Sequence, residues 1–263
     1  MEDRIMSKKK FLGGKNSNAY IVFYSAVMVI IVAIALAFTN QSLKERQNEN
    51  RLNEKKDAIV MSLGLDKGTY DDNITAYVIN EKGEKVDATD AFIFEQLSNL
   101  AGAYAENNLI VFENKHTGEV VIPVTGKGLW GDIWGYVALQ QDMNTIKGVI
   151  FDHAGETPGL GAEIATPKYQ AQFTANPKQI YNEAGEFVSI DVKKGGGMAK
   201  ELHAVDAVTG GTKTSDGLAA MLKDCLEKYD TYFKARQGEV TACNAEAEEC
   251  ATKCDKCTEV ENK

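Results

Sequence analysis

The chain has 263 residues, of which 44% are apolar, with 23 Gly and only 4 Pro, so it can build one substantial domain with attachments and is not a disordered protein. Its formal net charge of -9 argues against a nucleic-acid partner, because phosphate binding requires a clustered basic face. His116, His153 and His203 are scattered and lack the HExxH spacing of a zinc enzyme, so the sequence predicts no metal site here.

The first predicted element is a helix over residues 20–38, a stretch of 19 residues without a charge. At about 1.5 Å rise per residue, such a helix spans nearly all of a hydrocarbon core about 30 Å thick. The alternative is a cleaved signal peptide, but the apolar region of a signal peptide is usually shorter than this stretch. We therefore expect a membrane anchor that follows a cytoplasmic N-terminus over residues 1–19.

A polar stretch over residues 39–64 follows the predicted span. It mixes strong helix formers with charges of both signs, which predicts a stalk helix that leaves the membrane. Five Lys or Arg residues precede the span and five follow it closely, so the positive-inside rule gives nearly a tie, with a slight preference for the N-terminus inside.

The main domain is predicted over residues 65–235. A short helix is expected over residues 90–100, where Phe92, Leu97 and Leu100 would share one face. Short apolar runs bounded by turn residues predict strands over 74–80, 85–88, 109–113, 119–124, 133–139, 145–151 and 187–193. Because strands follow one another with few helices between them, we expect an α+β fold with an antiparallel or mixed sheet.

The clearest helix of the domain is predicted over residues 215–235. Its apolar side chains recur at helical spacing and predict one buried stripe, made of Leu218, Met221, Leu222, Cys225, Leu226, Tyr229 and Phe233. Cys225 is therefore expected to be a small buried apolar residue and not a functional thiol.

The segment that leads into this helix, residues 205–215, has the residue types of a ligand-binding loop. Gly210 and Gly211 remove Cβ atoms where the backbone turns sharply or approaches a bulky group. Hydroxyl groups at the start of a helix lie where free N–H groups and the helix dipole favour an anion. These hydroxyls belong to Thr209, Thr212, Thr214 and Ser215. The simpler interpretation is a polar turn in which Thr214 or Ser215 caps the helix and no ligand binds.

The run Asp206-Ala207-Val208-Thr209-Gly210-Gly211-Thr212 resembles the Asp-x-x-Ser/Thr-Gly-Ala-Thr signature of domains that carry flavin mononucleotide (FMN) as a phosphoester on the final threonine. Gly211 stands where alanine is usual. In that family a flavin transferase passes FMN from FAD to the hydroxyl. The resemblance therefore implies Thr212 as the covalent acceptor, with cofactor contacts from Asp206, Thr209, Gly210, Gly211 and Thr214.

A second stretch, residues 126–164, is similar to the C subunit of the sodium-translocating NADH:quinone reductase. The resemblance is carried by Gly-Lys-Gly-Leu-Trp, Asp-Met-Asn-Thr at 142–145 and His-Ala-Gly-Glu-Thr-Pro-Gly-Leu-Gly at 153–161, and in all it covers residues from about 11 to 235. Backbone and apolar groups of Thr157, Leu160 and Gly161 suit an isoalloxazine, and Trp130 offers a stacking surface. The alternatives are an ordinary Pro-Gly turn and a core tryptophan.

Gly126, Gly128 and Gly131 also match the GxGxxG pattern of dinucleotide-binding folds. That pattern requires a helix directly after it, whereas the residues that follow, DIWGYVAL, are typical of a strand. We therefore expect NADH to bind another subunit.

The resemblance implies an electron-transfer subunit that relays single electrons toward ubiquinone or another quinone, works with other subunits of a sodium-exporting membrane complex and is not catalytic alone. It also implies a single-pass protein of the cell inner membrane with its soluble domain on the periplasmic side. Two alternatives stay open: the homologous subunit of the ferredoxin:NAD oxidoreductase complex, and a flavin-free membrane-anchored binding module.

The chain ends in an acidic tail over residues 236–263, which departs from the family pattern. Its four thiols suit two disulfides in an oxidising compartment, or alternatively zinc or an iron–sulfur cluster, and belong to Cys243, Cys250, Cys254 and Cys257. We favour disulfides or a partly ordered tail over a metal, because the tail lacks the apolar residues that surround a cluster.

Overall fold

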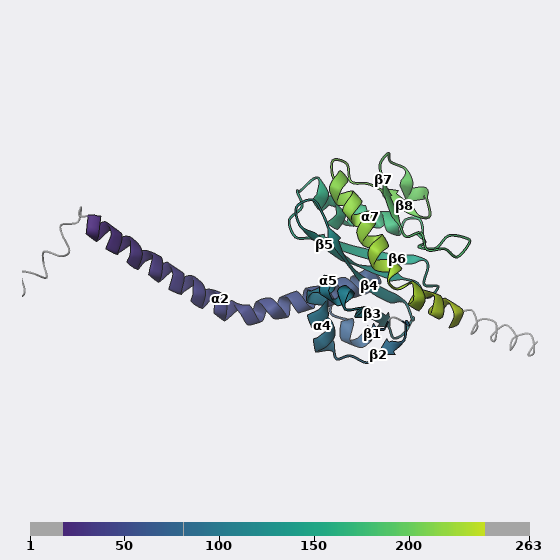
Figure 1. Cartoon of the computed structure of the whole chain (residues 1–263), viewed down its shortest axis with the longest axis horizontal. Coiled ribbons are helices and arrows are strands. Elements are labelled where there is room, and N and C mark those ends of the chain that lie inside the picture. The colour runs from purple at the N-terminus through teal and green to yellow at the C-terminus, as the bar shows by residue number, and fades with distance from the viewer. Residues whose placement is uncertain (1–17, 81, 240–263) are drawn as a thin grey trace, which may run out of the picture. The chain divides into compact units, whose positions relative to one another are not determined.

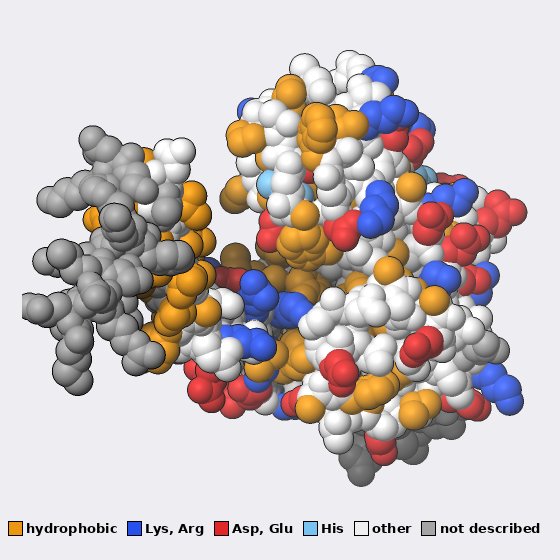
Figure 2. Space-filling view, turned by 60° about the vertical axis from the view of Figure 1, so that its left-hand side comes forward, with side chains coloured by type: hydrophobic (Ala, Val, Ile, Leu, Met, Phe, Trp, Pro, Cys, Tyr) orange, Lys and Arg blue, Asp and Glu red, His pale blue; other side chains and the backbone are white. Residues whose placement is uncertain are grey.

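The structure is a computed structural model that describes residues 18–80 and 82–239 (Figure 1). It forms two units, Met1–Asn53 and Glu54–Lys263. Helix α2 (Asn18–Ser62) is continuous and covers both the predicted span and nearly all of the predicted stalk. Every residue over 21–38 is exposed, and Figure 2 shows many of the hydrophobic side chains of this helix uncovered. By length and composition, α2 is able to cross a membrane.

The second unit is built on a six-stranded sheet in the order β2-β1-β3-β4-β5-β6, in which all neighbouring strands are antiparallel. The antiparallel sheet with helices confirms the predicted fold class. The strands are β1 (Ile74–Ile79), β2 (Lys85–Val86), β3 (Leu109–Asn114), β4 (Val120–Lys127), β5 (Asp132–Leu139) and β6 (Ile146–His153).

A separate parallel pair consists of β7 (Asp191–Lys193) and β8 (Ala204–Asp206). The predicted strand over residues 187–193 is therefore wrong for its first four positions. Phe187 forms only an isolated bridge with Tyr181, and Ser189 has a φ of 59°, which interrupts an extended strand.

Helices cover both faces of the sheet (Figure 1). On one face, Phe112 of β3 contacts Tyr70 of α3 (Tyr70–Asn73) and Phe94 of α4 (Asp90–Ser98). The end of α2 also joins the core of this unit, where Ile59 and Val60 are fully buried. The opposite face carries α7 (Thr212–Glu227) and the helical residues 230–239. The short helices are α5 (Leu100–Ala105), η1 (Gly161–Ala165), α6 (Pro167–Gln170), η2 (Ala171–Phe173) and η3 (Met198–Lys200).

The helix predicted over residues 90–100 is two helices, because Asn99 leaves the helical conformation and its side chain caps α5 by accepting from Gly102 N. Of the three predicted apolar residues, Leu97 and Leu100 are buried as expected, whereas Phe92 is 38% exposed and the prediction is wrong there. The buried face of α4 consists of Ile93, Phe94 and Leu97.

Helix α7 begins three residues earlier than predicted, at Thr212, and the chain leaves the helix at residues 228–229. The predicted apolar stripe is buried throughout, and Cys225 is a buried free thiol, as expected. Two glycines let α7 approach β4. A Cβ on Gly126 would lie 2.7 Å from Met221 Cβ, and one on Gly217 would overlap the carbonyl oxygen of Lys127.

Strands β3 and β4 pair only at Phe112–Val121 and Glu113–Val120. Two buried tyrosines supply hydrogen bonds to these strands. Tyr104 Oη donates to the carbonyl oxygen of Pro123, and Tyr229 Oη donates to that of Ile110 at 2.9 Å. The two rings also contact each other edge to face, with centroids 6.2 Å apart.

Candidate functional site

The loop from Asp206 to Gly211 leads directly from β8 into α7, and Thr212 is the first residue of that helix. Gly210 has a φ of 76°, a left-handed conformation that favours glycine. Thr209 and Gly210 are exposed and Thr212 is half-buried. The structure thus presents the Thr212 hydroxyl group at the start of a 16-residue helix.

The cap of this helix is Gly211, which provides no side-chain hydrogen bond, and the first turn contains no acidic residue. The prediction that Thr214 or Ser215 caps the helix is wrong, because both are buried inside its first turns. Ser215 Oγ instead accepts from Val208 N at 3.0 Å. Because the first N–H groups of a helix have no partner within it, the start of α7 suits a negatively charged group.

The turn over residues 157–161 lies against the same loop. The Thr157 carbonyl accepts from Leu160 N at 3.1 Å, and Gly159 has a φ of 74°. A Cβ on Gly210 would lie 2.6 Å from Leu160 Cδ2, and one on Gly211 would lie 3.3 Å from Gly161 N. Two motifs about 50 residues apart in the sequence are therefore in contact.

Glu156 joins a third motif to this site and was not among the predicted site residues. Its Oε1 accepts from Trp130 N at 2.8 Å, and its Oε2 accepts from Thr214 Oγ1 at 2.6 Å. Burial alone would raise the pKa of Glu156, but hydrogen bonds from Thr214 and from the backbone near Trp130 outweigh it and lower this pKa. A single acidic residue between Gly155 and the Pro158-Gly159 turn was the signal available in the sequence.

Trp130 is not a core residue: its side chain is 71% exposed, and its neighbour Leu129 is 55% exposed. Leu160, which touches the Gly210 position, is also exposed at 41%. Large apolar side chains are therefore accessible around the start of α7, where a flat aromatic ligand could use them.

The side chain of Asp206 binds the backbone of the loop that follows β7. Its carboxylate accepts from Gly197 N at 3.2 Å and from Met198 N at 2.8 Å, while its own N donates to Gln172 Oε1 at 3.0 Å. Because β7 and β8 are parallel, their carboxyl ends meet at one edge, and Asp206 fastens the loop after β7 to the start of the Thr212 segment.

Within residues 18–80 and 82–239, no group of three or more His, Cys, Asp or Glu is arranged to hold a metal ion. The four tail cysteines, Cys243, Cys250, Cys254 and Cys257, lie outside the described residues. The choice between disulfides and a metal therefore stays open.

Comparison with known proteins gives a consistent result. The FMN-binding domain family matches residues 128–227, a range that contains all ten predicted cofactor contacts. The C subunit of the Na(+)-translocating NADH-quinone reductase of Neisseria meningitidis is 32% identical over 236 residues, which cover 80% of this chain and 89% of the relative. The corresponding protein of Pseudomonas aeruginosa is 29% identical, over 87% of this chain and the whole of the relative.

Solved structures show the same similarity to C subunits of this reductase. The crystal structure of the C subunit of the Na(+)-translocating NADH-quinone reductase from Parabacteroides distasonis superimposes with a TM-score of 0.65 at 36% identity, covering 73% of this chain and 96% of that one. NqrC of Shewanella oneidensis gives a TM-score of 0.61 at 28% identity, over 70% of this chain and 97% of that one.

Proposed function

Because the chain belongs to the NqrC family, the C subunits of the Na(+)-translocating NADH-quinone reductases, we propose that it carries FMN as a phosphoester on Thr212 and relays single electrons toward quinone. The observation that carries this proposal is the position of Thr212, a half-buried hydroxyl residue at the start of a 16-residue helix that is capped by glycine. A phosphoryl group on Thr212 would be stabilised by the helix dipole and the free N–H groups of the first turn.

The residues around Thr212 fit the rest of the cofactor. Gly210 and Gly211 leave space that side chains would fill, and the exposed side chains of Trp130 and Leu160 offer apolar contact to an isoalloxazine. Bound FMN supplies reversible one-electron transfer, while the protein binds the ring, orients it and shields part of it from water. Covalent linkage would prevent loss of the cofactor to bulk solvent. The remaining proposed contacts are Asp206, Thr157, Gly161, Thr209 and Thr214.

The rest of the chain would hold this domain at the membrane. In this proposal, residues 1–19 are cytoplasmic, 20–38 span the inner membrane, 39–64 form the stalk and 65–235 form the periplasmic FMN domain, followed by the tail over 236–263. The exposed apolar surface of α2 supports the span. Partners would be the other subunits of the reductase complex and, during maturation, a flavin transferase.

Mass spectrometry tests the linkage directly. The full chain would be coexpressed with a flavin transferase and exported, and its peptides compared with those of Thr212→Ala and of the control variant Thr231→Ala, at an exposed threonine of the helical residues 230–239. We expect the mass of esterified FMN on the peptide that contains Thr212, its absence in Thr212→Ala and its retention in Thr231→Ala. An unmodified native chain, while a control acceptor is flavinylated, would contradict the covalent linkage and favour a flavin-free binding module.

A further inference from the structure

The carboxylate of Glu156 lies where three segments of the proposed site meet. It accepts from Trp130 N in the loop between β4 and β5, and from Thr214 Oγ1 in the first turn of α7. The backbone N of Glu156 donates to His153 Nδ1 at 3.2 Å, so the turn that carries Glu156 is itself attached to the end of β6. The carboxylate thereby links the Trp130 loop to the Thr212 helix.

Two glycines make room for this carboxylate. A Cβ on Gly128 would lie 2.5 Å from Glu156 Oε1, and a Cβ on Gly161 would overlap both Glu156 Oε2 and Thr214 Oγ1. Gly128 belongs to the Gly-Lys-Gly-Leu-Trp motif and Gly161 ends the motif over 153–161. A physical reason for glycine at both positions is therefore the close approach of one buried side chain.

Glu156 is only 4% exposed, and its hydrogen bonds hold its pKa below the ordinary value, so the group is an ionised buried carboxylate. Hydrogen bonds to a buried charge are stronger than those between neutral groups, and loss of the acceptor would leave Trp130 N and the Thr214 hydroxyl without this partner. These hydrogen bonds of Glu156 therefore hold the three segments together.

The geometry points to Glu156 as a positioning residue for flavin attachment and binding: it holds the exposed Trp130 and the Leu160 turn against the helix start that presents Thr212. The effect of Glu156 on flavin attachment rests on the proposed function, whereas the joining of the segments does not. Glu156 itself is buried beneath these segments, and its role is to fix the distance between the aromatic surface and the acceptor hydroxyl.

Hydrogen exchange of the unflavinylated full chain in detergent measures the positioning directly. In Glu156→Ala we expect amides of residues 128–131 and 212–216 to exchange about tenfold faster or more, while β4 and β5 stay protected. In Glu156→Gln exchange should stay close to that of the native chain, because the carboxamide oxygen can accept from Trp130 N and its nitrogen can donate to Thr214 Oγ1. Glu163→Gln, a partly exposed glutamate of the same region, is the matched control.

A second experiment measures the initial rate of flavin transfer to each variant. We expect a loss of about tenfold or more in Glu156→Ala and recovery in Glu156→Gln, since position matters here and not charge. Should Glu156→Ala fail to fold, Thr214→Val removes one contact alone and should speed exchange at 212–216 and slow flavin transfer.

Native exchange rates in both segments of Glu156→Ala, or native flavin transfer in both Glu156→Ala and Thr214→Val, would overturn the role of Glu156. If the native chain takes no flavin on Thr212, the proposed function fails, whereas the exchange comparison still decides whether Glu156 joins the segments, because no flavin takes part in it.

Discussion

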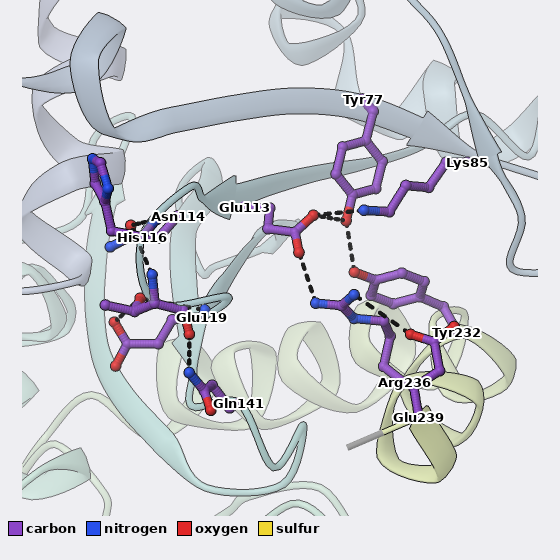
Figure 3. A network of polar contacts seen from close by, with 11 residues as sticks. Tyr77, Lys85, Glu113, Asn114, His116, Glu119, Gln141, Tyr232, Arg236 and Glu239 are labelled. Carbon is purple, nitrogen blue, oxygen red and sulfur yellow. Dashed lines mark hydrogen bonds and ion pairs between the residues drawn. The ribbon is translucent and has the colours of Figure 1, made fainter. Parts of the chain in front are cut away.

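Glu113 of β3 and Arg236 of the helical segment 230–239 form an ion pair, with Oε1 and Nη2 2.7 Å apart (Figure 3). The other carboxylate oxygen of Glu113 accepts from Tyr77 Oη at 2.9 Å and from Lys85 Nζ at 2.7 Å. Only 16% of the Glu113 side chain is exposed. One carboxylate therefore joins the last described helix to three strands of the sheet.

This cluster predicts an acid-sensitive contribution to stability. Burial alone would raise the pKa of Glu113, but its hydrogen bonds to Lys85 and Tyr77 and the charge of Arg236 lower it below the ordinary value of 4.5. The unfolded chain then binds more protons than the folded chain in acid, so this stabilisation is present above about pH 4.5 and is lost as the pH falls through the lowered pKa.

Glu113→Gln tests this cluster by urea unfolding of the full chain in detergent between neutral pH and about pH 3. We expect a loss of about 1–3 kcal/mol at neutral pH and a shallower decline in acid than in the native chain. Glu183→Gln, at an exposed position, is the control. An equally steep acid decline in Glu113→Gln would show that Glu113 does not carry this dependence.

The close packing of α7 on β4 predicts opposite effects for two glycine-to-alanine substitutions. Gly217→Ala should destabilise the domain, because the new Cβ would overlap the Lys127 carbonyl, by about 1–3 kcal/mol as for other overpacked sites. A Cβ on Gly238, in the helical segment 230–239, would meet no atom of the described residues within 4 Å, so Gly238→Ala should stabilise by about 0.5–1 kcal/mol through helix propensity. Urea midpoints measure both, and a shift of the same sign in the two variants would contradict the packing described.

Two buried tyrosines predict a similar contrast. Tyr229→Phe removes the donor to the Ile110 carbonyl and should destabilise by about 1–3 kcal/mol, because a buried acceptor loses its partner. Tyr169→Phe should be neutral or stabilising, since the buried Tyr169 hydroxyl has no hydrogen-bond partner among the residues that the structure describes. Thermal unfolding of the two variants under identical conditions distinguishes them, and equal losses of stability would contradict the difference between the bonded Tyr229 hydroxyl and the Tyr169 hydroxyl.

The two glycines before Thr212 should differ in their tolerance of alanine. Gly211 has a φ of -103°, which any residue adopts. A Cβ there would lie 3.0 Å from Val208 Cγ1, a tight contact that a small shift of this side chain relieves, so Gly211→Ala should keep most of the flavin after coexpression with the transferase. Gly210 has a φ of 76° and its Cβ would displace Leu160, so Gly210→Ala should lose most of it. Flavin absorbance per chain is the measurement, and equal flavin content in both variants would contradict this difference.

Local patterns in the sequence were sufficient to predict most helices and strands of this protein. An uncharged run of 19 residues needs no partner to predict a helix able to cross a membrane, and alternating apolar runs predicted all six strands of the main sheet. The stripe from Leu218 to Phe233 likewise predicted the buried face of the last helices. The element boundaries were less accurate, as at Asn99 and Thr212, because caps depend on backbone angles and on competing side chains.

The sequence by itself determined the apolar helix, the strand order along the chain and the Thr212 motif, since each depends on neighbouring residues. Only the tertiary structure decided that Trp130 is exposed, that Gly217 meets Lys127 and that Glu156 joins the Trp130 loop to the Thr212 helix. These relationships connect residues 26 to 90 positions apart, and hydrophobic periodicity carries no information about which distant backbone or hydroxyl group a buried carboxylate will meet.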